Sequence, residues 1–332
     1  MKALIQKLVE TFAPSGYEAP LRDLVMAEVS HLADEVRVDP LGNLIARKGS
    51  KSKDGLRIML AAHMDEIGLI ATHIDEHGFI RFTTIGGVRP HTLYGSRVRF
   101  LDGTPGVIGG ERIESIEKVL AFEKLFIDVG ATNKQDCPVK VGDVAAYDRP
   151  FLDLGNRLVA KSMDDRIAVA ILIETLRQVE RTPHELYFTF TTQEEVGVRG
   201  ATPAAFGIDP DLGIAVDVTL TGDTPKGAKM DVALGKGPAI KVKDTGMISD
   251  PRVVRWMAAA AEKAGLPHQF EILDGGSTDA RAIQLTRAGV PAGCVSIPCR
   301  YVHTPSEMVD FDDVQNTVKL LVELVSHPVN LK

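Results

Sequence analysis

The stretch "DDRIAVAILIETLRQVERTPHELYFTFTTQEE", residues 164–195, places a helix pattern directly before a strand pattern. Residues 164–180 predict a helix, and the apolar run at 185–192 is typical of a strand. Glu194 and Glu195, two adjacent carboxylates, follow that strand. A helix followed by a strand is the repeating unit of α/β folds, so this stretch sets the expected fold class.

The same alternation continues on both sides of this stretch. The C-terminal part predicts strands at 212–218, 268–273 and 291–297, and helices at 251–265, 278–289 and about 310–326. The N-terminal part predicts helices at 3–12 and 18–33, and strands at 35–39, 43–48 and 57–63. We therefore expect an α/β fold in which helices flank a central mixed sheet.

Residues 67–157 have a different pattern. Gly, Pro, Asp and Asn separate short strand-like runs at 68–75, 79–86, 96–101, 105–110, 125–130 and 143–148. Only 113–124 has the pattern of a helix, and it is short. Many short strands with turn residues between them indicate a small barrel or sandwich. We expect an inserted small β-barrel domain at 67–157 and a discontinuous α/β domain formed by 1–66 and 158–332.

The composition excludes several classes of protein. The 332-residue chain is 44% hydrophobic and 25% charged, with a formal net charge of −7, which is ordinary for a globular enzyme. No basic stripe alternates with aromatic residues, so we expect no nucleic-acid partner. No run approaches the roughly 18 apolar residues of a membrane-spanning helix, so we expect no membrane partner. The first residues, "MKALIQKLVETF", lack the features of a signal peptide.

The three cysteines, Cys137, Cys294 and Cys299, are too few and too unevenly spaced for a disulfide framework. The spacing in "CVSIPC" is not that of a zinc ribbon. We interpret all three as small buried residues and expect a reducing compartment, the cytoplasm.

Well-known catalytic motifs are missing from the sequence. It has no H-E-x-x-H helix, no P-loop, no G-x-G-x-x-G after a strand and no G-x-S-x-G elbow. The usual signatures of nucleotide cofactors and of serine hydrolases are therefore absent. Histidines and carboxylates at the ends of predicted strands remain as candidates.

The first candidate pair is His63 and Asp65 in "MLAAHMDEIG". Residues two apart in extended chain point to the same side, so Asp65 can hold one ring nitrogen of His63 while the other binds a metal. A histidine–aspartate pair at the surface is the alternative.

Two acidic pairs are further candidates for a metal site. Asp164 and Asp165 lie where a strand meets a helix, and capping of that helix is their alternative role. Glu194 and Glu195 would repel each other unless they were protonated or faced cations, and a solvated turn is their alternative setting.

Two single residues complete the set. Asp217 interrupts the apolar strand "LGIAVDV", where a buried carboxylate needs a partner. His303 follows another buried-type strand and precedes a loop.

Taken together, these residues support a metal site more strongly than any one of them does alone. Sites in open α/β sheets form at the carboxyl ends of strands, which is where all five segments place their polar residues. Imidazoles and carboxylates suit a pair of borderline divalent ions such as Zn²⁺ or Co²⁺. Glu195 can then bind an ion, and Glu194 can take a proton from a water between the ions.

The chain resembles the glutamyl-aminopeptidase and tetrahedral-aminopeptidase family of dinuclear metallopeptidases. The resemblance is carried, in order, by "APSGYE", "DPLGNLIA", "AAHMDEIG", "AKSMDDR", "TTQEEVGVRGA", "DGGSTDARAI" and "RYVHTPSEM". It implies a zinc-exopeptidase-like fold and two divalent metal ions per subunit, held by His63, Asp164, Glu195, Asp217 and His303. It further implies that Asp164 bridges the ions, Glu194 is the general base, Asp65 orients His63, and the Asp164–Asp165 peptide is cis.

The resemblance also implies a substrate pocket at Gly276, Ser277, Asp279 and Arg281. The segment "GGSTDAR" has Ser277 and Arg281 where the family often has a glycine and a small residue. Arg281 could favour an acidic first side chain of the substrate, or it could be an ordinary arginine on a helix surface.

The resulting hypothesis is a metal-dependent aminopeptidase that removes N-terminal residues from peptides. A water bridging the two ions would lose its proton to Glu194 and attack the first peptide bond. The alternatives are a related dinuclear amidohydrolase acting on acylated amino acids, and a scaffold without activity. The inserted domain has little room for a core of its own. Its segment "FTTIGGVRPHTLYG" suits an interface or a site-rim loop, so we expect dimers and a tetrahedral dodecamer.

Overall fold

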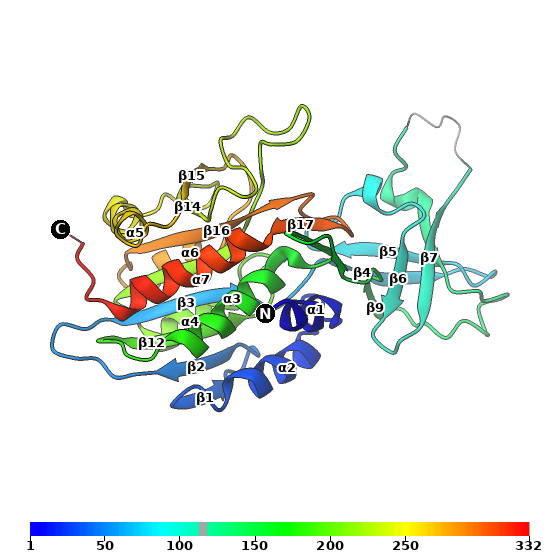
Figure 1. Ribbon diagram of the computed structural model, residues 1–332. Coiled ribbons are helices and arrows are strands. Elements are labelled where there is room, and N and C mark those ends of the chain that lie inside the picture. Colours follow the sequence, from blue (N-terminus) through cyan, green and yellow to red (C-terminus); the bar gives the residue numbers. More distant parts are fainter. Residues whose placement is uncertain (113–117, 332) are drawn as a thin grey trace.

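The computed structural model describes residues 1–112 and 118–331 (Figure 1). Its main sheet has the strand order β1-β2-β12-β3-β13-β16-β17-β11-β10, and β14 pairs with both β16 and β15. The bounds along this order are Glu35–Val38, Leu44–Lys48, Glu185–Thr191, Arg57–His63, Leu212–Thr219, Ala292–Arg300, Glu307–Asp310, Arg157–Ala160 and Leu152–Asp153, with β14 at Ala239–Lys243 and β15 at Gln269–Ile272. Strands β12, β3, β13 and β16 are parallel and the outer pairs are mostly antiparallel, so the predicted mixed sheet is confirmed.

Helices cover both faces of this sheet. The bounds are α1 (Lys2–Glu10), α2 (Ala19–Val29), α3 (Met163–Gln178), α4 (Ala201–Ile208), α5 (Pro251–Lys263), α6 (Asp279–Gln284) and α7 (Phe311–Ser326). Successive residues of a strand point to opposite faces. Accordingly Leu60 belongs to the apolar core that includes residues of α1, α2, α3, α5 and α7, whereas Met59 belongs to the smaller core that includes residues of α4 and α6. Figure 1 shows α3 and α7 lying side by side along the sheet.

The predicted β insert is a closed barrel. Its strands run in the order β4 (Gly68–Ile74), β5 (Ile80–Ile85), β8 (Leu125–Asp128), β7 (Pro105–Gly110), β6 (Arg97–Phe100) and β9 (Val144–Tyr147). In Figure 1 it stands to the right of the main sheet. Contrary to the expectation from its size, the barrel encloses an apolar core of its own, including Leu69, Phe82, Val98 and Ile127. Alternate inward-facing residues on six short strands are enough to fill so narrow a barrel.

Short elements account for most differences from the sequence-based expectation. Helix α4 and strands β14 and β17 were not predicted, and α6 ends at Gln284 instead of near 289. Pro203 and Gly207 weaken the helical signal of α4. Of the short helix expected at 113–124, residues 113–117 lie outside the described residues, and Phe122–Lys124 forms a single 3₁₀ turn, η2.

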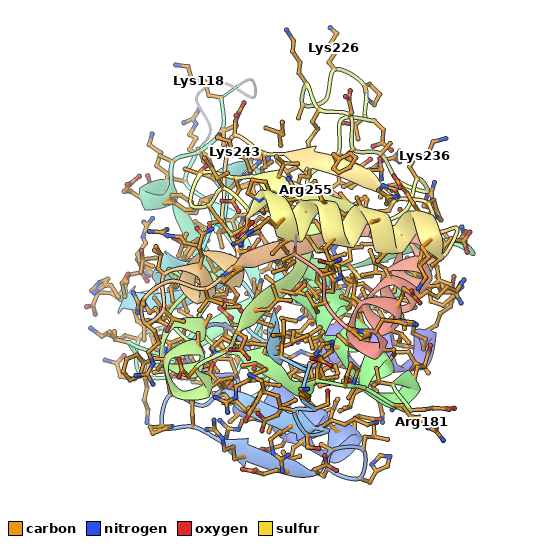
Figure 2. All side chains as sticks on the ribbon, turned by 90° about the vertical axis from the view of Figure 1, so that its left-hand side faces the viewer. Lys118, Arg181, Lys226, Lys236, Lys243 and Arg255 are labelled. Carbon is orange, nitrogen blue, oxygen red and sulfur yellow. The ribbon has the colours of Figure 1, made fainter. Side chains whose placement is uncertain are left out.

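Figure 2 shows the outer side of α5, with Arg255 on it and Lys226, Lys236 and Lys243 projecting around it.

Within the described ranges, no helix is long and apolar enough to cross a membrane. Cys294 and Cys299 are buried as expected, Cys137 is half-buried, and all three are free.

Candidate metal centre

The predicted site residues lie together at the carboxyl ends of the parallel strands. His63 ends β3, and its neighbour in β12 is Thr191, after which the chain turns into Glu194 and Glu195. Asp217 lies near the end of β13, and His303 follows β16. Asp164 lies at the start of α3, directly after β11. Because β3, β12, β13 and β16 are parallel, their carboxyl ends bring these residues together.

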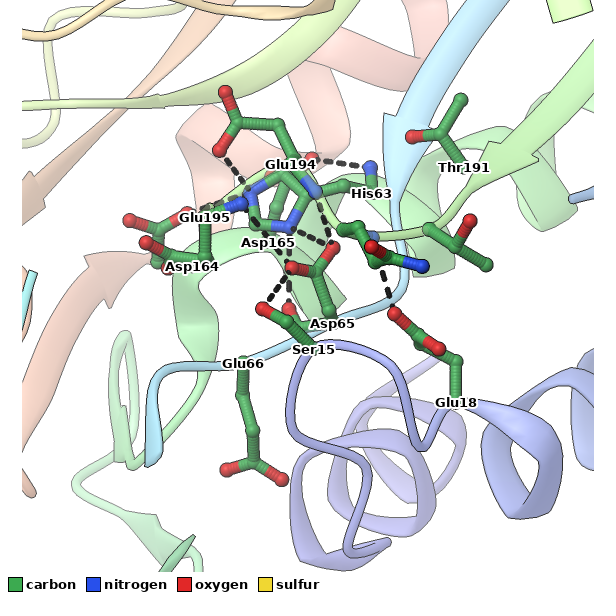
Figure 3. Close-up of polar contacts among 12 residues, drawn as sticks. Ser15, Glu18, His63, Asp65, Glu66, Asp164, Asp165, Thr191, Glu194 and Glu195 are labelled. Carbon is green, nitrogen blue, oxygen red and sulfur yellow. Dashed lines mark hydrogen bonds and ion pairs between the residues drawn. The ribbon is translucent and has the colours of Figure 1, made fainter. Parts of the chain in front are cut away.

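Asp164 lies between the two histidines. One carboxylate oxygen, Oδ1, is 3.0 Å from His63 Nε2, and the other, Oδ2, is 3.3 Å from His303 Nε2. Glu195 Oε2 is 3.2 Å from the same nitrogen of His303. Glu194 Oε2 is 3.9 Å from His63 Nε2. Figure 3 shows this arrangement around His63.

Two overlapping groups in the described part of the chain have ligand atoms close enough to hold a metal ion. One comprises His63, Asp164 and Glu195, and the other comprises His63, Asp165 and Asp217, with the atoms of each within 4.8 Å of one another. Asp165 is the member that the predicted ligand set lacks. The peptide bond between Asp164 and Asp165 is cis, as the resemblance implied.

Asp65 is fully buried and organises the loop that carries the acidic pair. Its carboxylate accepts hydrogen bonds from the backbone N–H groups of Glu194 (2.9 Å) and Glu195 (3.1 Å) and from Ser15 Oγ (2.6 Å). Nδ1 of His63 lies 3.4 Å from Asp65 Oδ1 and 3.1 Å from its carbonyl oxygen. A proton on Nδ1 is thereby held, which leaves Nε2 to face Asp164.

Burial and like charges shape the electrostatics of the cluster. Burial, followed by the charges of Asp217 and Glu195, raises the pKa of Glu194 well above its ordinary value. Burial also raises the pKa of Asp217 and of Asp165. Burial alone would raise the pKa of Asp164, but hydrogen bonds with His303 and His63 lower it below the ordinary value. Burial and mutual repulsion disfavour the charged form of these carboxylates, and nearby cations would stabilise it.

Glu307 has a central role that the sequence did not reveal. Its buried carboxylate accepts hydrogen bonds from the backbone N–H of Asp164 (2.9 Å) and of His303 (2.8 Å). His303 has a φ of 64°, in the left-handed region that few non-glycine residues adopt. Glu307 therefore fixes the backbone of two candidate ligands that lie far apart in the sequence. Its place inside the motif "RYVHTPSEM" was the available signal.

A cavity of about 430 Å³ lies beside the cluster. Four carboxylates line it, those of Asp164, Glu194, Glu195 and Asp217. Of the four residues predicted to bind substrate, Gly276, Ser277 and Arg281 line this cavity. The fourth, Asp279, is buried behind its wall and accepts a hydrogen bond from Thr191 Oγ1 at 2.5 Å.

The barrel contributes to the same cavity through the loop after β5. Gly87 and Arg89 line it. A Cβ atom at Gly87 would lie 2.4 Å from His303 Nδ1, so only glycine allows this close approach. The segment 82–95 was expected to form an interface or a loop at the rim of the site. Its middle part, Gly87 and Arg89, lines the cavity as a site-rim loop would, whereas Tyr94 is exposed.

Comparison with known proteins identifies relatives of this chain. The sequence profile of the M42 glutamyl aminopeptidase family matches residues 42–320. The lysyl aminopeptidase of Pyrococcus furiosus is 37% identical over 97% of this chain and 96% of its own length. An aminopeptidase structure from Desulfurococcus kamchatkensis has a TM-score of 0.94 and 41% identity, covering 98% of this chain and 94% of that one.

A solved structure of the Pyrococcus horikoshii TET1 peptidase, described as able to assemble into a tetrahedron or a large octahedral shell, has a TM-score of 0.87 and 32% identity, covering 98% of both chains. The family profile spans most of the chain, and both the sequence relative and the structures cover nearly all of it. The chain therefore belongs to the M42 glutamyl aminopeptidase family.

Proposed function

We propose that this protein is a metal-dependent aminopeptidase that removes N-terminal residues from peptides. The observation that carries the proposal is the cluster at the sheet edge, in which Asp164 lies between His63 and His303 and Glu194 faces the same cavity. Membership of an aminopeptidase family supports the reaction class.

The residues present fit divalent metal ions. Imidazole nitrogen and carboxylate oxygen are the donors that zinc and cobalt sites use. The buried carboxylate oxygen Glu195 Oε1 has no hydrogen-bond partner among the described residues, as expected of an atom that binds an ion. We propose that His63, Asp164, Glu195, Asp217 and His303 hold two ions, with Asp164 shared between them.

Each side chain then has a distinct task in the proposed reaction. When bound, the ions would lower the pKa of a water molecule and polarise the scissile carbonyl group. Glu194 accepts the proton of the attacking water and donates it to the amine nitrogen that leaves. Asp65 keeps the 194–195 loop and the ring of His63 in place through the contacts described above.

The proposal extends to domains, compartment and assembly. We assign catalysis to residues 1–66 and 158–332, and subunit contacts to the barrel segment 67–157. The ability of the Pyrococcus horikoshii TET1 peptidase to form a tetrahedron supports dimers that assemble further into a dodecamer. The three free cysteines favour the cytoplasm.

The test is a panel of substrates offered to the purified protein after loading with Zn²⁺ or Co²⁺. We expect hydrolysis of several aminoacyl p-nitroanilides, loss of activity with a chelator and recovery when metal is restored. Cleavage of N-acetylated amino acids without cleavage of any aminoacyl anilide would instead identify a deacylase. No hydrolysis of either class would leave only the scaffold role.

A further inference from the structure

The motif "APSGYE", residues 13–18, belongs to the connection between α1 and α2. Glu18, its last residue, is a carboxylate that is only 5% exposed. A carboxylate is costly to bury unless hydrogen bonds satisfy it, so the partners of Glu18 indicate what it does.

Glu18 does not cap the helix that begins beside it. It occupies the N-cap position of α2, yet its side chain makes no capping hydrogen bond with that helix. Instead Oε1 accepts two backbone N–H groups, from Gly16 at 2.8 Å and from Gln193 at 3.0 Å. The second bond spans 175 positions of the chain and joins the motif to the turn that carries the acidic pair.

Three successive backbone N–H groups of that turn donate to buried carboxylates. Glu18 accepts the N–H of Gln193, and Asp65 accepts those of Glu194 and Glu195. In Figure 3, Glu18 and Asp65 both lie below Glu194. Each oxygen of Asp65 is engaged by one of these bonds, which leaves Glu18 as the acceptor for Gln193.

Gln193 depends on this bond because its backbone is strained. Its φ is 55°, in the left-handed region that disfavours every residue with a Cβ atom. Its side chain makes no hydrogen bond with any residue that the structure describes, so it does not hold the backbone there itself. Its carbonyl oxygen accepts the N–H of Arg199 at 3.1 Å, within the same turn. The carboxylate of Glu18 is thus the contact that reaches Gln193 from a distant segment.

We propose that Glu18 is a positioning residue for the base. By holding Gln193 in the left-handed conformation, its carboxylate sets the direction in which the chain enters Glu194 and hence where that side chain meets the cavity. The proposal rests on the proposed function, in which Glu194 exchanges the protons. Glu195 lies one residue further along, and its carboxylate contacts His303 at 3.2 Å. Loss of Glu18 should therefore displace the base more than the metal ligand.

Kinetics with leucyl p-nitroanilide on metal-loaded enzyme test the proposal. Glu18→Met removes the acceptor at similar volume, and kcat should fall by about tenfold or more, the scale of a lost supporting contact at an active site. KM and the metal content measured by mass spectrometry should stay close to those of the unmodified enzyme. Glu18→Gln should keep most of the turnover, because its amide oxygen can accept both N–H groups. Glu180→Met, at an exposed glutamate, is the control.

A second substitution tests the route through Gln193. Glycine adopts a φ of 55° without strain, so in a Gln193→Gly background the loss of kcat caused by Glu18→Met should shrink to about threefold or less. A loss of the same size in both backgrounds overturns the proposal, because Glu18 would then act by another route. If Glu18→Met alone does not fold, as judged by circular dichroism, the double variant must fold and turn over substrate. Failure of both to fold also overturns the proposal, since Glu18 would then serve only the fold.

The outcomes separate this proposal from the proposed function. Turnover by the unmodified enzyme, together with a Glu18→Met variant that matches Glu180→Met, overturns the positioning role and leaves the aminopeptidase intact. A Glu18→Met variant that loses metal, or in which KM rises and kcat does not fall, also overturns it. Failure of the unmodified enzyme to cleave any aminoacyl anilide rejects the proposed function, and the positioning role with it.

Discussion

Glu194 and Glu195 are neighbours in sequence but face different partners in the fold. Glu195 points to His303 at 3.2 Å, whereas Glu194 lies 3.9 Å from His63 and faces the cavity. The N–H groups of both residues donate to Asp65, which fixes the turn between them. One carboxylate can therefore bind an ion while the adjacent one remains available to exchange protons.

Replacement of Glu194 by glutamine tests this division. The amide keeps the shape of the side chain but cannot accept a proton, so kcat should fall by about 10²-fold or more, the scale of general-base catalysis. Metal content measured by mass spectrometry should stay the same. Glu180→Gln, at an exposed glutamate, serves as the control. Full activity in metal-loaded Glu194→Gln would exclude Glu194 as the base.

Glu307 offers a second test at the level of one residue. Its two oxygens each accept one backbone N–H, from Asp164 and from His303. In Glu307→Gln, one N–H would face an NH₂ group, and both candidate ligands should lose their fixed positions. We expect metal affinity, measured by calorimetry on metal-free protein, to fall by about 10-fold or more. An affinity equal to that of the Glu180→Gln control would show that Glu307 supports only the fold.

The candidate ligands could be predicted because they are polar residues within or beside apolar strands, as with His63 after "RIMLAA". The contacts of Ser15, Glu307 and Gly87 could not. Ser15 reaches Asp65 across 50 positions, and Gly87 meets His303 only because the barrel folds back onto the sheet. Such contacts depend on packing between distant segments, which strand and helix patterns do not encode.

At the level of elements, His184 joins three segments just before β12. Its Nδ1 accepts the N–H of Leu56 at 2.9 Å, so the ring proton lies on Nε2 and is donated to the carbonyl oxygen of His327 at 2.8 Å. Burial lowers the pKa of His184 below its ordinary value. The neutral ring of His184 therefore connects the start of β12 to Leu56, just before β3, and to His327, just after α7.

This contact predicts a dependence of stability on pH. A histidine whose pKa is lower in the folded state binds fewer protons there than in the unfolded chain, so its contribution is present above the ordinary pKa of about 6.5 and is lost as pH falls below it. The free energy of unfolding from urea titrations should fall more steeply below pH 6.5 in the unmodified protein than in His184→Gln, by at most about 1.4 kcal/mol per pH unit. His31→Gln, at an exposed histidine, should behave like the unmodified protein. Identical pH profiles for all three proteins would contradict the assignment.

The long elements were predictable, whereas some of the short ones were not. Helix α3 combines a long apolar run with acidic residues at its start, and β12 follows it with an apolar strand pattern. By contrast, β14 and β17 have 5 and 4 residues, and their patterns do not differ from those of loops. Pairing with β16 defines both strands, so tertiary contacts decide their conformation.

At the level of the whole molecule, the barrel has an apolar core of its own and also contributes residues to the cavity. Its apolar interior is distinct from the core around the main sheet, yet its loop at Gly87 and Arg89 reaches the cavity. The insertion leaves the sheet just after His63 and returns just before Asp164. A loop of the barrel therefore forms part of the surroundings of His303.

The outer surface of the barrel predicts self-association. Tyr94, Leu101, Val107 and Val141 are between 47% and 64% exposed, which is a high density of large apolar side chains for so small a domain. Closed point-group symmetry is the norm for homo-oligomers, so a dimer through this domain and a closed particle built from dimers are expected. Light scattering of the metal-loaded protein at micromolar concentration should give an oligomeric mass, and Tyr94→Asp should lower it. A monomeric mass would exclude the interface, whereas a dimeric mass would exclude only the closed particle. In that particle, a chamber around the sites would admit peptides and exclude folded proteins.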